Sequence, residues 1–182
     1  MKKTLLCLAL ATTALTASAR EPQRGYRGFV DFSNSITHFG SDYEKTTYWN
    51  AGFSTTHGYQ FNHNLFVGAG LAMEFNDFDI LPLFAAVRYD RTFGRFTPYA
   101  ELRAGYNCAN GGGIYFSPTV GYRFNWGRKA NINVGLGLSV WGYSYDRYYV
   151  DMDYENSAFI IEYMGRGHSV KPSFSFRIGV DF

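Results

Sequence analysis

The end of the chain alternates strictly between two kinds of residue. From Val170 to Phe182, every even-numbered position is apolar, and every odd-numbered position is polar, charged or glycine. Successive side chains of a β-strand point to opposite faces, so a period of two indicates a strand with two different surfaces. We therefore expect a final strand from Lys171 to Phe182 with one apolar and one polar face.

The same alternation recurs along the rest of the chain. It covers residues 27–33, 49–54, 64–74, 81–90, 97–107, 114–125 and 130–141. With the final strand this predicts about eight strands of roughly ten residues, the length that a tilted strand needs to cross a bilayer. The predicted connections are mostly short turns at 57–63, 91–96 and 125–129 and longer loops at 37–46, 107–112 and 146–167. Short periplasmic turns and longer outer loops are typical of outer-membrane barrels.

The composition of the two faces indicates which one points inward. A soluble lipocalin-like barrel would place the apolar face inside. Here the polar face carries both signs of charge and many glycines, whereas the apolar face is almost free of charge in the middle of each strand. A charge facing lipid at the midplane costs about 2–4 kcal/mol. We therefore predict an all-β, up-and-down antiparallel transmembrane β-barrel with its polar face in the lumen.

Eleven charged residues are assigned to this lumen. An eight-stranded barrel is only wide enough for side chains to fill it, so we expect these charges to pair and close the pore rather than line a conduit. They are Arg27, Asp31, Glu74, Arg88, Asp90, Glu101, Arg103, Arg123, Lys171, Arg177 and Asp181.

The first nineteen residues do not belong to the predicted barrel. Lys2 and Lys3 precede an apolar run, and Ala17-Ser18-Ala19 has the form of a cleavage site. This pattern predicts a secretory signal peptide at 1–19 and a barrel domain at 20–182. The barrel domain then retains only Cys108, so it must be stable without an internal disulfide. A formal net charge of +2 does not favour nucleic-acid binding.

The last nine residues, Phe174-Ser175-Phe176-Arg177-Ile178-Gly179-Val180-Asp181-Phe182, resemble the C-terminal strand of bacterial outer-membrane proteins. The layout of the chain is similar to OmpX-like and OmpW-like barrels and to the outer membrane protein β-barrel domain families. The resemblance implies a location in the bacterial outer membrane, contact with outer-membrane lipid, and an assembly signal formed by Phe182, Val180 and Ile178. In those families the barrel assembly machinery reads this signal.

The longest predicted loop, at about 143–167, is rich in tyrosine and acidic residues. Tyrosine-rich loops form adaptable binding surfaces, so we expect a structural or surface-interaction protein that binds an extracellular ligand through this loop. The candidate binding residues are Tyr145, Tyr148, Tyr149 and Tyr154. Asp151 and Asp153 alone are weak evidence for Ca²⁺, so no metal and no cofactor is expected. We expect a monomer.

Two other functions stay open. The first is transport of small apolar molecules through a narrow or lateral opening, which the resemblance to OmpW-like barrels would allow. Pro118 in the sixth strand is expected either to form a bulge or to lie above the bilayer, and an irregular wall there would suit such an opening. The second, less favoured, is an enzyme at the outer rim. His38 and His168 lie near serines and an aspartate there, but no spaced catalytic motif accompanies them. The rim residues are Ser35, Ser41, Asp42 and Ser169.

Overall fold

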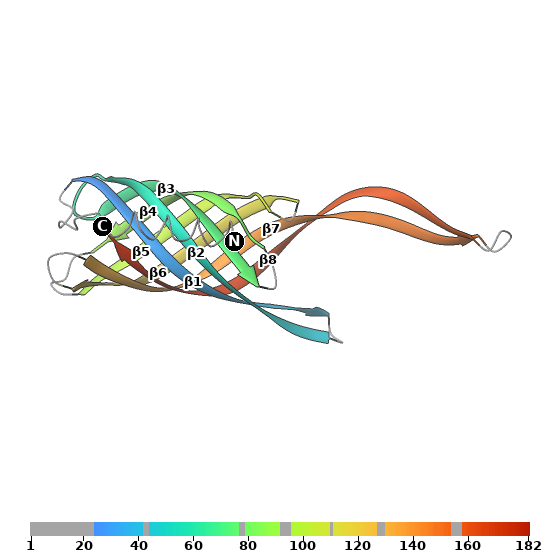
Figure 1. Ribbon diagram of the computed structural model, residues 1–182, viewed down its shortest axis with the longest axis horizontal. Helices are drawn as coiled ribbons and strands as arrows, with labels where there is room; N and C mark the ends of the chain where they lie inside the picture. Colours follow the sequence, from blue (N-terminus) through green and yellow to red (C-terminus); the bar gives the residue numbers. More distant parts are fainter. Residues whose placement is uncertain are drawn as a thin grey trace, which may run out of the picture.

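The computed structural model describes residues 24–41, 44–76, 79–91, 96–109, 111–126, 130–153 and 158–182. Eight antiparallel strands close into one up-and-down barrel (Figure 1). The strands are β1 (Gly25–Ser41), β2 (Glu44–Gln60), β3 (Leu65–Asn76), β4 (Pro82–Asp90), β5 (Phe96–Asn107), β6 (Gly113–Trp126), β7 (Ala130–Asp153) and β8 (Ala158–Asp181). No helix among the described residues is long and apolar enough to cross a membrane.

The polar face of the strands points into the barrel, as the charge pattern predicts. Along β4, buried and exposed positions alternate without a break. The inward Arg88 is 1% exposed, whereas its outward neighbour Val87 is 46% exposed. The other strands follow the same rule within the barrel: their arginines and carboxylates are buried, and most of their leucines, valines and phenylalanines are exposed. The lipocalin-like alternative, with an apolar interior, is therefore wrong.

The barrel closes where β1 meets β8. These strands pair antiparallel from Phe29 opposite Asp181 to Ile36 opposite Phe174. Beyond that ladder, the backbone of Phe182 exchanges two hydrogen bonds with Gly28, at 2.9 and 3.0 Å. The last residue of the chain therefore forms the final rung of the closing seam.

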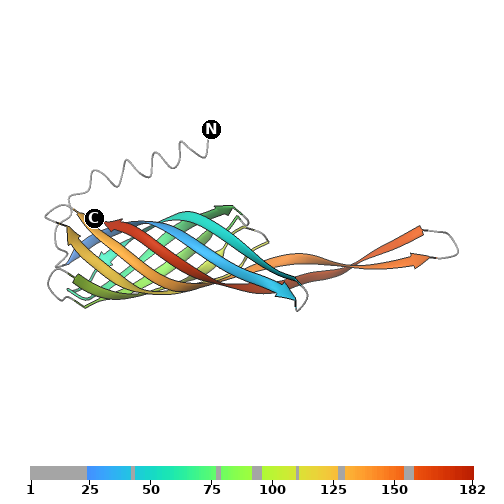
Figure 2. The same ribbon diagram turned by 90° about the horizontal axis from the view of Figure 1, so that it is seen from below.

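The expectation of irregular loops at 37–46 and 146–167 is wrong. β1 and β2 continue as paired strands to Ser41 and Glu44, and β7 and β8 stay paired as far as Asp153 and Ala158. The second pair forms a long two-stranded ribbon beyond the barrel, which we call the β7–β8 hairpin (Figures 1 and 2). Outside the barrel, both faces of a ribbon are exposed to the same surroundings. Its sequence therefore need not alternate between apolar and polar residues, and the alternation does not predict its strands.

The ends of the barrel differ. Strands β2, β4 and β6 end at the same end of the barrel as the C-terminus, and the extended hairpins lie at the other end (Figure 2). The predicted signal peptide, residues 1–19, lies outside the described residues.

Candidate functional site

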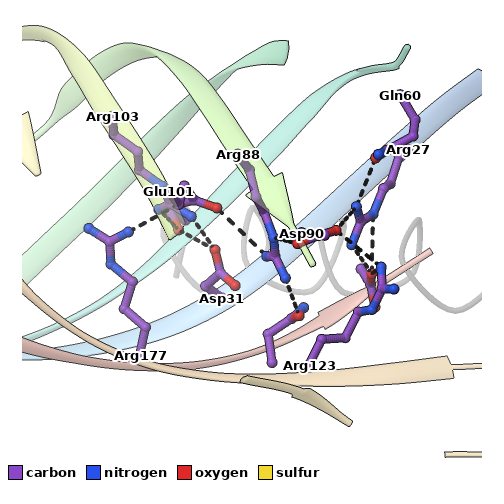
Figure 3. A network of polar contacts seen from close by, with 12 residues as sticks. Arg27, Asp31, Gln60, Arg88, Asp90, Glu101, Arg103, Arg123 and Arg177 are labelled. Carbon is purple, nitrogen blue, oxygen red and sulfur yellow. Dashed lines mark hydrogen bonds and ion pairs between the residues drawn. The ribbon is translucent and has the colours of Figure 1, made fainter. Parts of the chain in front are cut away.

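The lumen near the C-terminal end is organised around the carboxylate of Asp90. Its Oδ2 accepts hydrogen bonds from Arg27 at 2.5 Å and from Arg123 at 3.2 Å. Its Oδ1 accepts one from Arg88 at 2.8 Å. Arg27 also donates to Asp181 at 2.6 Å. Four strands, β1, β4, β6 and β8, are therefore tied together across the interior (Figure 3).

A second set of ion pairs lies further along the barrel, around Glu101 on β5. Arg103 donates to Glu101 and also to Asp31 on β1, the latter at 2.5 Å. Arg177 on β8 approaches Glu101 at 3.3 Å. Arg88 joins the two sets, because its Nη1 lies 3.7 Å from Glu101. We call the joined sets the lumen network (Figure 3).

The lumen network includes nine of the eleven charged residues assigned to the lumen. They are Arg27, Asp31, Arg88, Asp90, Glu101, Arg103, Arg123, Arg177 and Asp181. The other two are also buried but have different neighbours. Glu74 accepts a hydrogen bond from Ser35 at 3.0 Å. Lys171 lies with its ammonium among three aromatic rings, 4.9 Å from the ring centre of Tyr143 and 5.6 Å from that of Trp141.

Aromatic side chains fill the space between the guanidinium groups. Arg27 and Arg88 each lie over the ring of Phe29, at 4.6 and 4.7 Å. Arg88 also lies 3.6 Å from the ring centre of Tyr99. The Phe66 ring meets Phe29 edge-on at 4.9 Å. These rings were not among the residues predicted for the lumen site, although the phase of the alternation already assigns Phe29 and Tyr99 to the inward face.

The expectation of a bulge at Pro118 is wrong. The register of β6 against β7 is the same on both sides of Pro118, and β5 pairs with it through Leu102. Proline has no N–H to give to the ladder. The hydroxyl of the preceding residue, Ser117, instead donates to the carbonyl of Leu138 at 3.1 Å. β6 and β7 thus keep one register past Pro118, although the described ladder has no rung at residues 117 and 118. This unbroken register does not favour the lateral opening considered above.

The β7–β8 hairpin carries three of the four tyrosines named as binding candidates. Tyr145, Tyr148 and Tyr149 are each about half exposed. Tyr148 packs edge-on against Tyr163 of the opposite strand, with ring centres 5.7 Å apart. The fourth candidate, Tyr154, lies outside the described residues.

Among the rim residues considered for an enzyme, the side chains that the structure describes do not meet in one site. His168 hydrogen-bonds Ser144 at 2.9 Å on the exposed hairpin. Ser35 instead points into the lumen toward Glu74. Asp42 and the side chain of His38 lie outside the described part of the chain. Among the described residues, no group of three or more metal-binding side chains is placed to hold a metal ion.

The three residues of the proposed assembly signal lie on the outer face of the closing seam or at its end. Ile178 and Val180 are exposed on the outward face of β8. The Phe182 ring covers Gly28 so closely that a Cβ at Gly28 would lie 2.6 Å from it. Glycine in a strand often marks a close approach of this kind. Its recognition by the assembly machinery stays a prediction.

No family model and no curated protein sequence matches the chain. Solved structures are similar in fold. Neisserial surface protein A (NspA) superposes with a TM-score of 0.53 at 14% identity, covering 86% of this chain and 96% of that one. The outer membrane protein OprG from Pseudomonas aeruginosa gives 0.51 at 13% identity, covering 90% of this chain and 99% of that one. Both are small outer-membrane barrels of eight strands, and this chain has the same architecture.

Proposed function

Starting from the fold of a small outer-membrane barrel, we propose that the chain is a monomeric integral protein of the bacterial outer membrane that binds an extracellular protein through its β7–β8 hairpin. The short turns and the C-terminus then face the periplasm, and the extended hairpins face outward. The observation that carries the proposal is the length of the hairpin beyond the barrel wall (Figure 1).

The lumen supports this proposal by leaving little room for transport. Buried ion pairs and aromatic rings occupy the interior between the level of Asp181 and the level of Arg177 along the barrel axis. An eight-stranded barrel has an interior that side chains are able to fill. The lumen network is therefore best explained as the interior packing that fixes strand register, and the function lies elsewhere on the molecule.

The hairpin has two edges that are suited to a partner. Among the described pairings, β7 is no longer paired with β6 after Trp141, and β8 is not yet paired with β1 before Phe174. From there each strand pairs only with the other, as far as Asp153 opposite Ala158. Edges of this kind expose unpaired N–H and C=O groups, which are templates for an added strand.

The composition of the hairpin indicates the charge of its partner. Residues 143–167 contain six tyrosines, five acidic residues and two arginines, so the segment has a formal net charge of −3. Tyrosine gives a large contact area at a low entropic cost. A basic protein surface complements this charge, whereas the anionic headgroups of the outer leaflet do not. We therefore expect the partner to be a basic protein segment.

The proposal is tested by site-specific photo-crosslinking on living cells. A photoreactive amino acid replaces Tyr149 on the hairpin or, as the control, Tyr122 on the lipid-facing wall; both side chains are about half exposed. We expect a discrete protein adduct at position 149 and none at position 122. Purified intact protein should suppress the adduct by competition. Absence of an adduct at 145, 148 and 149 would count against the proposal.

A truncated protein provides the matched competitor. Replacing residues 148–163 by Asn-Gly cuts the ribbon at its β-bulge, between Arg147 and Tyr148, and retains the pairing of Arg147 with Gly165. Gly165 has a φ of +109° there, a conformation that favours glycine, so it is kept. The truncated barrel should fold and migrate as a heat-modifiable band but fail to compete. Failure to fold would show that the ribbon is part of the barrel core.

A further inference from the structure

The outer wall of the barrel has a trough across β4, β5, β6 and β7. Two adjoining hollows of about 550 and 660 Å³ share Tyr89, Ala100, Val120 and Leu136 as lining residues. Ala100 lies between Tyr89 and Val120 on the neighbouring strands. Because its side chain is a single methyl group, the wall is lower there than at the larger residues around it.

The trough is apolar along most of its length and has a cation at one end. Toward the middle of the barrel it reaches Pro118 and Leu138. Toward the C-terminal end it reaches Tyr122 and Arg91. Arg91 directly follows β4, and its backbone N–H donates to the carbonyl of Pro98 at 2.9 Å, which fixes the backbone beside β5. The Arg91 side chain is exposed.

We propose that this trough binds one phospholipid of the periplasmic leaflet, with an acyl chain along Ala100 and Val120 and the phosphate at Arg91. This inference rests on the orientation given under the proposed function, in which the C-terminal end faces the periplasm. An acyl chain is the apolar ligand that a membrane supplies to a lipid-facing hollow, and each buried methylene contributes about 0.8 kcal/mol.

The polar end of the trough matches a phospholipid headgroup. A guanidinium group binds phosphate through paired, charge-assisted hydrogen bonds. Tyr89 and Tyr122, both about half exposed, flank this end. Tyrosine is enriched where a membrane protein crosses from hydrocarbon to headgroups. An apolar chain site that ends at an interfacial arginine therefore selects an anionic, chain-bearing ligand over a neutral one.

The test measures retention of defined lipids by the purified full-length protein in native mass spectrometry. The probes are palmitoyl-oleoyl phosphatidylglycerol and the diacylglycerol with the same chains. We expect one phosphatidylglycerol to be retained, and A100F to lower this retention about tenfold. The matched control is A69F, because Ala69 is another exposed alanine of the outer wall, on β3, outside the trough. R91Q should lower retention of phosphatidylglycerol about tenfold and leave diacylglycerol unchanged.

Several results would overturn the site. The first is equal retention of phosphatidylglycerol by A100F and A69F, and the second is equal retention of the two probes by the unmodified protein. The third is a dimer that A100F dissociates without changing lipid retention. The last result would assign the trough to a second copy. If A100F does not fold, A100L replaces it, and photoreactive phosphatidylglycerol on the unmodified protein must label β4 to β7. Labelling elsewhere contradicts the site.

The outcome is separable from that of the proposed function. A protein that is not integral to the membrane would be released by alkaline extraction before any lipid is measured. The protein lacking residues 148–163 should retain phosphatidylglycerol as the full-length protein does. Failure of the hairpin proposal therefore leaves lipid retention intact, and failure of the lipid site leaves crosslinking at Tyr149 intact.

Discussion

Arg27 and Asp181 form an ion pair across the seam where the barrel closes, with Nη2 of the arginine 2.6 Å from Oδ2 of the aspartate. The two residues are 154 positions apart, on the first and last strands of the barrel. Arg27 also contacts Asp90, the carboxylate at the centre of the C-terminal half of the lumen network. Closure of the barrel and packing of its lumen are therefore coupled through one side chain.

Asp90 is expected to be the most sensitive position of the lumen network. D90N removes the negative charge that Arg27, Arg88 and Arg123 share and leaves an excess of buried positive charge there. The loss should destabilise the barrel by about 3–5 kcal/mol. The measurement is equilibrium unfolding in urea, followed by the heat-modifiable band in detergent or liposomes. D146N is the control, because the pair of Asp146 with Arg166 is 3.7 Å long and 46% and 60% exposed. It should cost less than about 1 kcal/mol. Equal losses would contradict the role given to Asp90.

Ser117 and Pro118 are expected to be coupled through the carbonyl of Leu138. S117A removes the hydroxyl that donates a hydrogen bond to this carbonyl, so the substitution should destabilise the barrel. In a P118V background the new backbone N–H is able to take that place, and the loss from S117A should be smaller by about 1 kcal/mol. The contacts of Ser117 with Arg177 and Ser139 are lost in both backgrounds and cancel in the cycle. Additive effects in urea unfolding would refute the compensation.

The aromatic ring of Phe182 is expected to matter more for assembly in cells than for folding in isolation. F182A removes the ring that covers Gly28 but keeps the backbone bonds of the seam. We expect the amount of folded barrel in cells to fall several-fold, with a smaller loss when the purified protein refolds in detergent. F182Y keeps an aromatic ring and serves as the control. A loss of the same size in both settings would make Phe182 a packing residue rather than an assembly signal.

Some of this structure is predictable from local sequence and some is not. The period of two assigns Arg27, Asp90 and Asp181 to one face because alternation depends only on neighbouring positions. The alternation does not predict which of these residues contact one another. Those contacts depend on the register between strands that are far apart in the chain. The unbroken register at Pro118 could not be predicted for the same reason: the carbonyl to which Ser117 donates belongs to Leu138, on the next strand. The candidate Tyr148 was predicted in a loop, since a ribbon exposed on both faces shows no alternation.

Single-channel recording in planar lipid bilayers tests most directly whether the lumen is closed and the function lies on the outer surface. The lumen network crosses the interior between β1 and β4 and between β8 and β5, with Arg88 joining its two halves. We expect the unmodified protein to insert without stable conductance steps. Stable, ion-selective openings from the unmodified protein would show that the lumen conducts, and would contradict the account.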